Sequence, residues 1–222
     1  EDDGRGIPSG MNEKLGLPTL EVIYTVLHAG GKFGGEGYKI AGGLHGVGAS
    51  VVNALSEWLE VENCRDGKKY SERFEKGKVA RPFKCEGETD RHGLYVRFKP
   101  DGEIFETLVF DYDTLLRRLR EQAFLNAGIR VVLTDKRTDA DEPDRTDDLC
   151  FEGGISSFVE YLNDKRKVNP LHQNVIHLST ADGDSIAEVA MQYGDNYNEL
   201  MLSFANNIRT VEGGTHEDGF KQ

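Results

Sequence analysis

The stretch Gly42-Gly43-Leu44-His45-Gly46-Val47-Gly48 holds four glycines and leads directly into a helical pattern over residues 49–59. Glycine lets the backbone approach a ligand closely and adopt positive φ angles. The free N–H groups at the start of a helix favour an anion. The stretch therefore predicts a loop that wraps phosphate groups, and a merely flexible loop is the alternative.

The spacing of these glycines separates the stretch from better-known phosphate loops. It follows the pattern G-x-x-G-x-G, whereas the dinucleotide fingerprint is G-x-G-x-x-G after a strand. The chain has no G-K-[ST] of a P-loop, and the signatures of protein kinases are absent from the sequence as well.

Two further stretches upstream fit a nucleotide site. In Asp2-Asp3-Gly4-Arg5-Gly6-Ile7-Pro8, a carboxylate can accept the exocyclic amino proton of adenine while glycine leaves room for the base, although a plain turn has the same composition. The lysines of Gly30-Gly31-Lys32-Phe33 and Tyr38-Lys39 can close over phosphate oxygens as mobile charges. A solvated surface loop is the alternative for them.

Hydrophobic periodicity predicts the surrounding elements. Residues 19–28 predict a helix that Thr19 caps and that Gly30-Gly31 ends. A strand pattern with Leu59, Val61 and Asn63 on one face leads to a hairpin turn at Asp66-Gly67 and a return strand. The sequence thus predicts helices followed by antiparallel strands, and a further strand carries Leu94, Val96 and Phe98.

The second half alternates helices and strands. Residues 113–126 predict an amphipathic helix that buries Leu115, Leu116, Leu119 and Ala123, and a strand pattern with Ile129, Val131 and Leu133 follows. The acidic residues 139–148 predict a solvated linker. Beyond it, residues 154–163 predict a helix, and residues 187–193 and 200–204 predict adjacent strands.

Together these patterns predict an α+β fold in which helices lie on a mixed sheet, followed by part of a second α/β unit. We expect one domain over residues 1–150 and the start of another over residues 151–222. Because Glu1 is not an initiator methionine and the last residues lack a finishing element, we expect the chain to be a fragment.

Composition limits the classes of function. The formal net charge of −12 argues against DNA binding by bulk attraction, so any DNA contact needs a local patch or another part of the protein. Cys64, Cys85 and Cys150 form no CxxC pair, which argues against a zinc site and favours a reducing, cytoplasmic setting. No apolar run approaches the roughly 20 residues that a membrane span needs, so no membrane partner is expected.

The ordered set of motifs resembles the GHKL ATPase family and, within it, the ATPase subunit of bacterial type IIA topoisomerases. The resemblance runs along the whole chain and includes residues 151–155, 158–163 and 206–216. It implies a Bergerat-type ATP-binding domain followed by a transducer domain related to ribosomal S5 domain 2.

The resemblance also implies a role for each site residue. Asp2 would bond the adenine amino group, with a water near Gly6, and Arg5 and Ile7 would flank the pocket. Lys32, Tyr38 and Lys39 would belong to a lid that reaches the nucleotide. Arg65 would be the arginine that contacts aminocoumarin inhibitors, and an exposed hairpin residue is its alternative. The backbone that wraps the phosphates would come from Gly43, Leu44, His45, Gly46, Val47 and Gly48.

Two departures from the family pattern stand out. Leu94 follows Gly93 where relatives carry a threonine that bonds the water of the adenine site. The resemblance also implies a general-base glutamate and a magnesium-binding asparagine on a helix upstream of Glu1, so the catalytic residue is not assigned within this sequence.

The implied activity is an ATP-dependent type II DNA topoisomerase that uses ATP and Mg²⁺ for DNA strand passage. Its partners would be DNA, a DNA-cleaving protein in an A2B2 heterotetramer, and a second copy of this region, which dimerises with ATP. Residues 38–41 and 167–171 favour the enzyme that introduces negative supercoils, and topoisomerase IV is the alternative. A non-catalytic nucleotide-binding fragment is the second alternative, because without the base the isolated chain is expected to be inactive.

Overall fold

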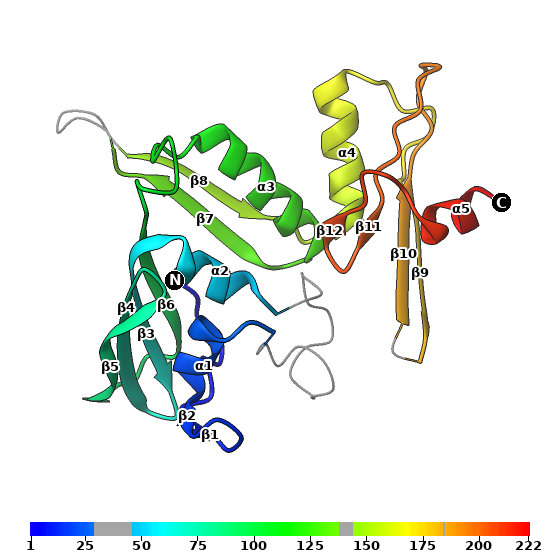
Figure 1. The fold of residues 1–222 in the computed structure, drawn as a ribbon. Coiled ribbons are helices and arrows are strands. Elements are labelled where there is room, and N and C mark those ends of the chain that lie inside the picture. The colour runs from blue at the N-terminus through cyan, green and yellow to red at the C-terminus, as the bar shows by residue number, and fades with distance from the viewer. Residues whose placement is uncertain (29–45, 138–143, 184) are drawn as a thin grey trace. The chain divides into compact units, whose positions relative to one another are not determined.

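The structure, a computed structural model, describes residues 1–28, 46–137, 144–183 and 185–222 (Figure 1). Its contacts divide the chain into two compact units, Glu1–Val109 and Phe110–Gln222. Both units contain helices and antiparallel strands, which confirms the predicted α+β class. None of the described helices is long and apolar enough to cross a membrane.

The first unit is built on a four-stranded sheet with the order β5-β4-β3-β6, and all its neighbours are antiparallel. A short pair, β1 with β2, precedes the helices. The bounds are β1 (Met11–Asn12), β2 (Leu17–Pro18), α1 (Thr19–Thr25), α2 (Gly48–Ala54), β3 (Ser56–Arg65), β4 (Lys68–Glu75), β5 (Lys78–Glu88) and β6 (Gly93–Pro100).

The core of this unit lies between one face of the sheet and α1. The predicted alternation in β3 is confirmed, because Leu59, Val61 and Asn63 are all buried. Leu59 and Val61 pack in one cluster with Tyr24 of α1 and with Phe74 of β4. Helices α1 and α2 contact each other beside this cluster (Figure 1). Burial of apolar side chains therefore fixes which face of the sheet meets the helices.

The predicted hairpin turn is also confirmed. Asp66 and Gly67 connect β3 to β4, and both have positive φ angles, 53° and 73°. A two-residue turn of this kind needs positive φ at both central positions, which aspartate tolerates and glycine adopts freely.

Both predicted helices of the first unit are wrong in part, and one strand was missed. Helix α1 ends at Thr25 instead of residue 28, and Thr19 is its first residue, with a side chain that donates to the Gly10 carbonyl instead of capping the helix. The helix predicted over residues 49–59 ends at Ala54, and β3 begins at Ser56 because this segment pairs with both β4 and β6. Strand β5 was not predicted, since ten of its eleven residues are exposed and its pattern is largely polar.

In the described part of the second unit, β7 pairs with β8, β9 with β10 and β11 with β12, all antiparallel. Helix α3 packs against β7, β8 and α4. The bounds are α3 (Tyr112–Leu125), β7 (Arg130–Asp135), β8 (Arg145–Cys150), α4 (Gly154–Arg166), β9 (Ile176–Asp182), β10 (Ser185–Met191), β11 (Phe204–Ala205), β12 (Ile208–Arg209) and α5 (Thr215–Lys221).

Helix α3 matches its predicted range within one residue at each end. Its buried face carries Leu116, Ala123 and Phe124, but Leu115 is 36% exposed, so the prediction that Leu115 faces inward is wrong. Phe124 stacks on Phe151 and on Phe158 of α4, which joins the two helices through aromatic packing.

Two further predictions in this unit are wrong. Residues 145–148, predicted as linker, belong to β8, because they pair in register with residues 132–135 of β7. Strand β10 pairs with β9 and not with residues 200–204, of which only Phe204 lies in a strand. Every pairing between described strands is antiparallel, so the parallel pairs of a mixed sheet are not among them.

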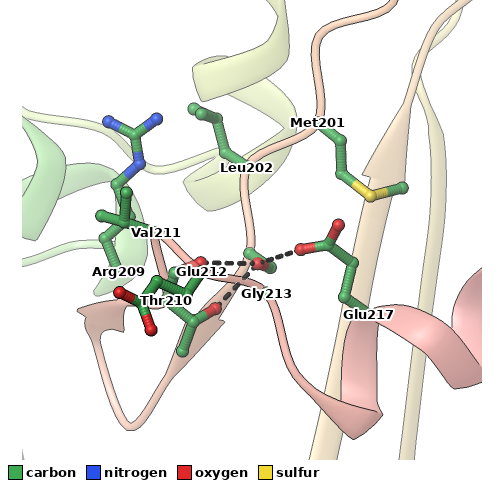
Figure 2. A pocket seen from close by; sticks show the side chains of 9 residues that line it. Met201, Leu202, Arg209, Thr210, Val211, Glu212, Gly213 and Glu217 are labelled. Atoms are coloured by element: carbon green, nitrogen blue, oxygen red, sulfur yellow. Dashed lines mark hydrogen bonds between the residues drawn. The ribbon is translucent and has the colours of Figure 1, made fainter.

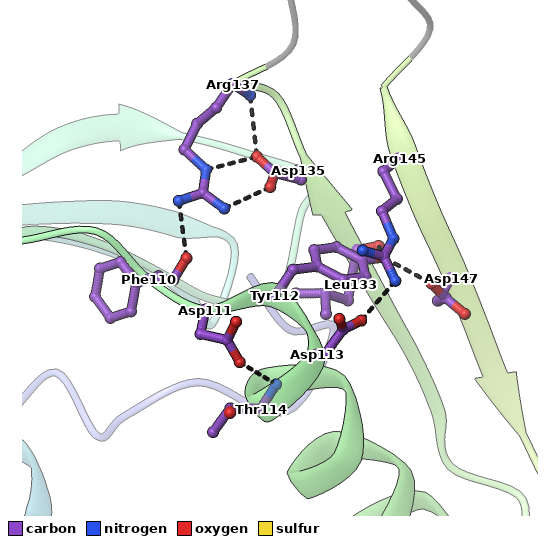
Figure 3. A network of polar contacts seen from close by, with 10 residues as sticks. All are labelled: Phe110, Asp111, Tyr112, Asp113, Thr114, Leu133, Asp135, Arg137, Arg145 and Asp147. Atoms are coloured by element: carbon purple, nitrogen blue, oxygen red, sulfur yellow. Dashed lines mark hydrogen bonds and ion pairs between the residues drawn. The ribbon is translucent and has the colours of Figure 1, made fainter.

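A network of polar contacts holds the start of α3 (Figure 3). Asp111 caps the helix by accepting a hydrogen bond from the Thr114 amide over 2.7 Å. Tyr112 donates to Asp147 of β8 over 2.8 Å, and Arg137 donates to the Phe110 carbonyl over 2.8 Å. The hydrogen bonds that Arg137 gives to Asp135 lower the pKa of this carboxyl group to about 2.

Candidate nucleotide site

Asp2 is held at the beginning of β6. Its N–H donates to the Leu94 carbonyl over 2.8 Å, and its Oδ1 accepts from the Leu94 amide over 3.3 Å. The same oxygen accepts from the Gly4 amide over 2.9 Å. Asp2 is exposed, so its carboxylate is fixed by backbone donors while remaining open to a ligand.

Gly93 makes this attachment possible. Its φ is +106°, and a Cβ atom at this position would lie 2.0 Å from the Asp2 carbonyl oxygen. Such a contact is far below any normal separation, so only glycine lets β6 approach the Asp2 backbone this closely.

The other end of the motif formed by residues 2–8 is fixed on β3. Gly6 has a φ of +69°, and its carbonyl accepts a hydrogen bond from Arg65 Nη1 over 2.9 Å. Ile7 exchanges two hydrogen bonds with the side chain of Asn63. The structure thus brings together Asp2, Arg5, Gly6 and Ile7, four of the predicted site residues, and attaches the predicted inhibitor contact Arg65 to the same turn.

Tyr24 of α1 connects the motif to the core. Its ring stacks on Phe74, with centroids 5.7 Å apart, and it is 5% exposed. Burial and, second, the charge of Asp2 raise the pKa of the Tyr24 hydroxyl to about 12. The Tyr24 carbonyl in turn accepts a hydrogen bond from Asn53 of α2 over 2.9 Å. Ile7 of the same motif packs against the core cluster that contains Tyr24, so the motif, α1 and α2 belong to one packed arrangement.

The last three residues of the glycine stretch lie at the start of α2. Gly46 has a φ of +61°, as expected for a glycine that turns the chain before a helix. Val47 is the N-cap residue and provides no side-chain cap, and a Cβ atom on Gly48 would meet open space. Because no side chain caps the start of α2, its first N–H groups are available to donate to a phosphate group, and the open space at Gly48 leaves room for one.

The other predicted members of the site, Lys32, Tyr38, Lys39, Gly43, Leu44 and His45, lie outside the residues that the structure describes. Within the described ranges, no group of three or more His, Cys, Asp or Glu side chains could hold a metal ion.

Sequence patterns did not assign a role to Gly93, Tyr24 or Asn63. Gly93 precedes a strand pattern, and nothing in the sequence tells that the backbone of Asp2 crosses it. Asn63 carried a signal, because it is a polar residue on the apolar face of the β3 pattern. A buried polar residue in such a position has a hydrogen-bond partner, but only the fold tells which one.

A small hollow beside Asp2 is lined by Cys64, His92 and Tyr95, among others. A larger cavity of about 290 Å³ lies in the second unit, and Figure 2 shows its lining by residues 201–203, 209–213 and 217. There Ser203 Oγ donates to Glu217 Oε2 over 2.7 Å, so part of the polar lining is bonded internally. The lining contains none of the predicted site residues.

Comparisons with known proteins point to one family. The family model described as DNA gyrase B matches residues 154–222. The DNA gyrase B proteins of Halalkalibacterium halodurans and Clostridium acetobutylicum are 56% and 53% identical to the chain over 99% of its length, and that of Staphylococcus aureus is 52% identical over all of it. In each case the chain spans 34% of the relative's own length.

A solved structure supports the same class. The 43K ATPase domain of Thermus thermophilus gyrase B, crystallised with an aminocoumarin, superimposes with a TM-score of 0.83 at 37% identity. The match covers 99% of this chain and 54% of that one. The chain therefore has the fold of a gyrase B ATPase domain. Over nearly its whole length the chain is similar to DNA gyrase B proteins, at 52–56% identity, and the family model agrees over residues 154–222.

Proposed function

We propose that this chain is the ATP-binding part of a DNA gyrase B protein, in which it couples ATP binding to DNA strand passage and negative supercoiling. The observation that carries the proposal is the Asp2 carboxylate, which backbone donors from Gly4 and Leu94 hold in place at an exposed position. A fixed acceptor beside glycine suits the exocyclic amino group of adenine.

The residues at hand fit an adenine nucleotide. Asp2 would accept the amino proton, while Gly6 and Ile7 form the turn behind it and Arg5 flanks it. The backbone from Gly43 to Gly48 would hold the phosphates, and Lys32, Tyr38 and Lys39 would close over them. Bound ATP supplies the free energy of binding and hydrolysis, and the chain's own residues bind and orient it.

Leu94 stands where relatives carry a threonine in the adenine site, but the backbone of Leu94 still holds Asp2. Its N–H and carbonyl both bond Asp2, so the tether of the carboxylate needs no side-chain hydroxyl. We expect the water near Gly6 to be held by Asp2 alone.

In this proposal, the general base is the glutamate and the Mg²⁺ ligand is the asparagine that the family resemblance implies. No described residue is assigned to either task, and the isolated chain is expected to hydrolyse ATP only at background rate. Robust magnesium-dependent turnover by the chain alone would contradict this expectation.

The partners follow from the same proposal. They are DNA, the gyrase A protein in an A2B2 heterotetramer, and a second copy that dimerises with ATP. The match of the family model from residue 154 onward supports a boundary near residue 150 between the ATP-binding and transducer domains, although packing divides the chain at Val109. Topoisomerase IV would relax and decatenate DNA without supercoiling it, so a supercoiling assay of the reconstituted enzyme distinguishes the two.

Titration with a non-hydrolysable ATP analogue tests the site itself. Asp2→Asn turns one carboxylate acceptor into an amide, and we expect it to weaken binding of the analogue by about tenfold or more. Asp3→Asn is the matched control, because Asp3 is exposed in the same motif. Equal affinity of the Asp2 variant and the wild type would overturn the assignment of the pocket.

A further inference from the structure

Asn63 is an amide side chain in an apolar layer. It lies on the inner face of β3 in line with Leu59 and Val61, and it is 0% exposed. A buried amide destabilises a fold unless its polar atoms are hydrogen-bonded. The partners of its hydrogen bonds therefore indicate the role of Asn63.

Both of these bonds go to one residue. The Ile7 amide donates to Asn63 Oδ1 over 2.8 Å, and Asn63 Nδ2 donates to the Ile7 carbonyl over 2.8 Å. Two residues in an antiparallel ladder exchange N–H and C=O bonds in the same way. Ile7 lies outside the strands, so the Asn63 side chain provides the partner that a strand backbone would otherwise supply.

The contact with Gly6 makes this attachment tight. A Cβ atom on Gly6 would lie 2.7 Å from Asn63 Oδ1 and 2.8 Å from the Cys64 carbonyl oxygen. The turn thus rests directly on the amide and on the β3 backbone. Arg65 holds the same turn from the side through its bond to the Gly6 carbonyl.

The motif is consequently attached at two points. Asp2 is bonded to Leu94 of β6, and Ile7 is bonded to Asn63 of β3. Only four residues separate Asp2 from Ile7, so a shift of the turn at Ile7 moves the carboxylate as well.

We propose that Asn63 is a positioning residue for purine recognition, because it fixes Gly6 and Ile7 on β3 and thereby sets the orientation of the Asp2 carboxylate. The inference rests on the proposed ATP-binding function. The Asn63 side chain contacts the turn at Gly6 and Ile7 and not the reacting atoms. Its effect is therefore on binding of the purine.

The test is Asn63→Leu in the complete natural protein, since leucine has a similar shape but no polar atoms. We expect about a tenfold loss of affinity for a non-hydrolysable ATP analogue, while affinity for inorganic tripolyphosphate, which has no base, stays unchanged. Hydrogen exchange of the Ile7 amide, measured without nucleotide, is expected to become faster. Asn163→Leu is the control, because it removes an asparagine hydrogen bond of 2.8 Å to Gln192 in the other unit.

Asn63→Thr is the second variant in case the leucine variant does not fold. Threonine suits a strand and keeps one polar group, so an intermediate loss of analogue affinity is expected. Unchanged analogue affinity would overturn the role of Asn63, whether or not exchange at Ile7 becomes faster. Equal losses for the analogue and tripolyphosphate would also overturn it, since they would reflect a general structural defect.

The Asp2→Asn variant separates this outcome from failure of the proposed function. If Asp2→Asn binds the analogue as well as the wild type does, the assigned pocket is wrong. If Asp2→Asn loses affinity and Asn63→Leu does not, only the positioning role is wrong.

Discussion

The buried carboxyl group of Glu72, in β4, interacts electrostatically with the carboxylate of Glu21, in the first turn of α1. Glu72 is 0% exposed, and neither of its carboxylate oxygens has a well-formed hydrogen bond among the described residues. Burial and, second, the charge of Glu21 raise the pKa of the Glu72 carboxyl group to about 7, although the nearby Phe83 amide lowers it in part. The folded protein therefore binds a proton here that the unfolded chain releases at lower pH.

This arrangement predicts a dependence of stability on pH. An unfolded glutamate has a pKa near 4.5, so the free energy of unfolding should fall as the pH rises from about 4.5 through 7 and level off above. The shift corresponds to a loss on the order of 3 kcal/mol. Glu72→Gln should abolish this contribution and be more stable than the wild type at pH 8, as measured by denaturant unfolding.

Glu57→Gln is the matched control for Glu72, because Glu57 lies on the neighbouring strand β3, pairs with Lys99 and is partly exposed. This substitution should leave the pH profile of the wild type nearly unchanged. A Glu72→Gln profile that follows the wild type throughout would mean that Glu72 is solvated or paired in solution.

Gly93→Ala should damage both stability and nucleotide binding. The added Cβ atom would lie 2.0 Å from the Asp2 carbonyl oxygen at a φ of +106°, so the first residues must leave β6. We expect a destabilisation of roughly 1–3 kcal/mol and a loss of ATP-analogue affinity. Gly67→Ala separates the two effects, because its φ is also positive but its Cβ atom would meet nothing within 4 Å. If Gly93→Ala keeps full affinity, Asp2 does not need β6.

Asp111→Ala should weaken the start of α3. The side chain of Asp111 accepts from the Thr114 amide, and the hydrogen bonds with Thr114 lower the pKa of its carboxyl group. Because the folded pKa is lowered, the stabilisation is present above the unfolded value and is lost as the pH falls through the folded one. We expect a drop of a few degrees in melting temperature at pH 7 that shrinks toward acidic pH. The serine variant, which can still cap, should restore most of it.

Phe124→Ala should be the most destabilising of these changes. Phe124 is 1% exposed, stacks on Phe151 and Phe158, and packs at a tilt against Tyr161. Removal of a buried phenylalanine side chain typically costs about 3–5 kcal/mol, because it leaves a cavity. Leu115→Ala on the exposed side of the same helix is the control and should cost well under half of that. Similar losses for both variants in thermal unfolding would contradict the orientation of α3.

The short-range patterns of the sequence predicted several elements well. The alternation around Val61, the turn at Asp66-Gly67 and the helix after Asp111 depend on neighbours in the chain, and the structure has all three. The region from Ser56 to Leu59 was predicted as helix, because its apolar spacing fits a helical period. Pairing of β3 with β4 on one side and with β6 on the other outweighs this local preference.

The sequence by itself determined the α+β class and the likeness to gyrase B proteins, and it predicted the motifs of a nucleotide site, because glycine spacing and hydrophobic period are properties of the chain order. Only the tertiary structure decided that Asp2 is tied to Leu94, that Asn63 bonds Ile7 and that Glu72 is buried without a well-formed hydrogen bond. These contacts join residues from 56 to 92 positions apart or bury a charge under another element. No local period encodes them, since they arise when strands and helices close over one another.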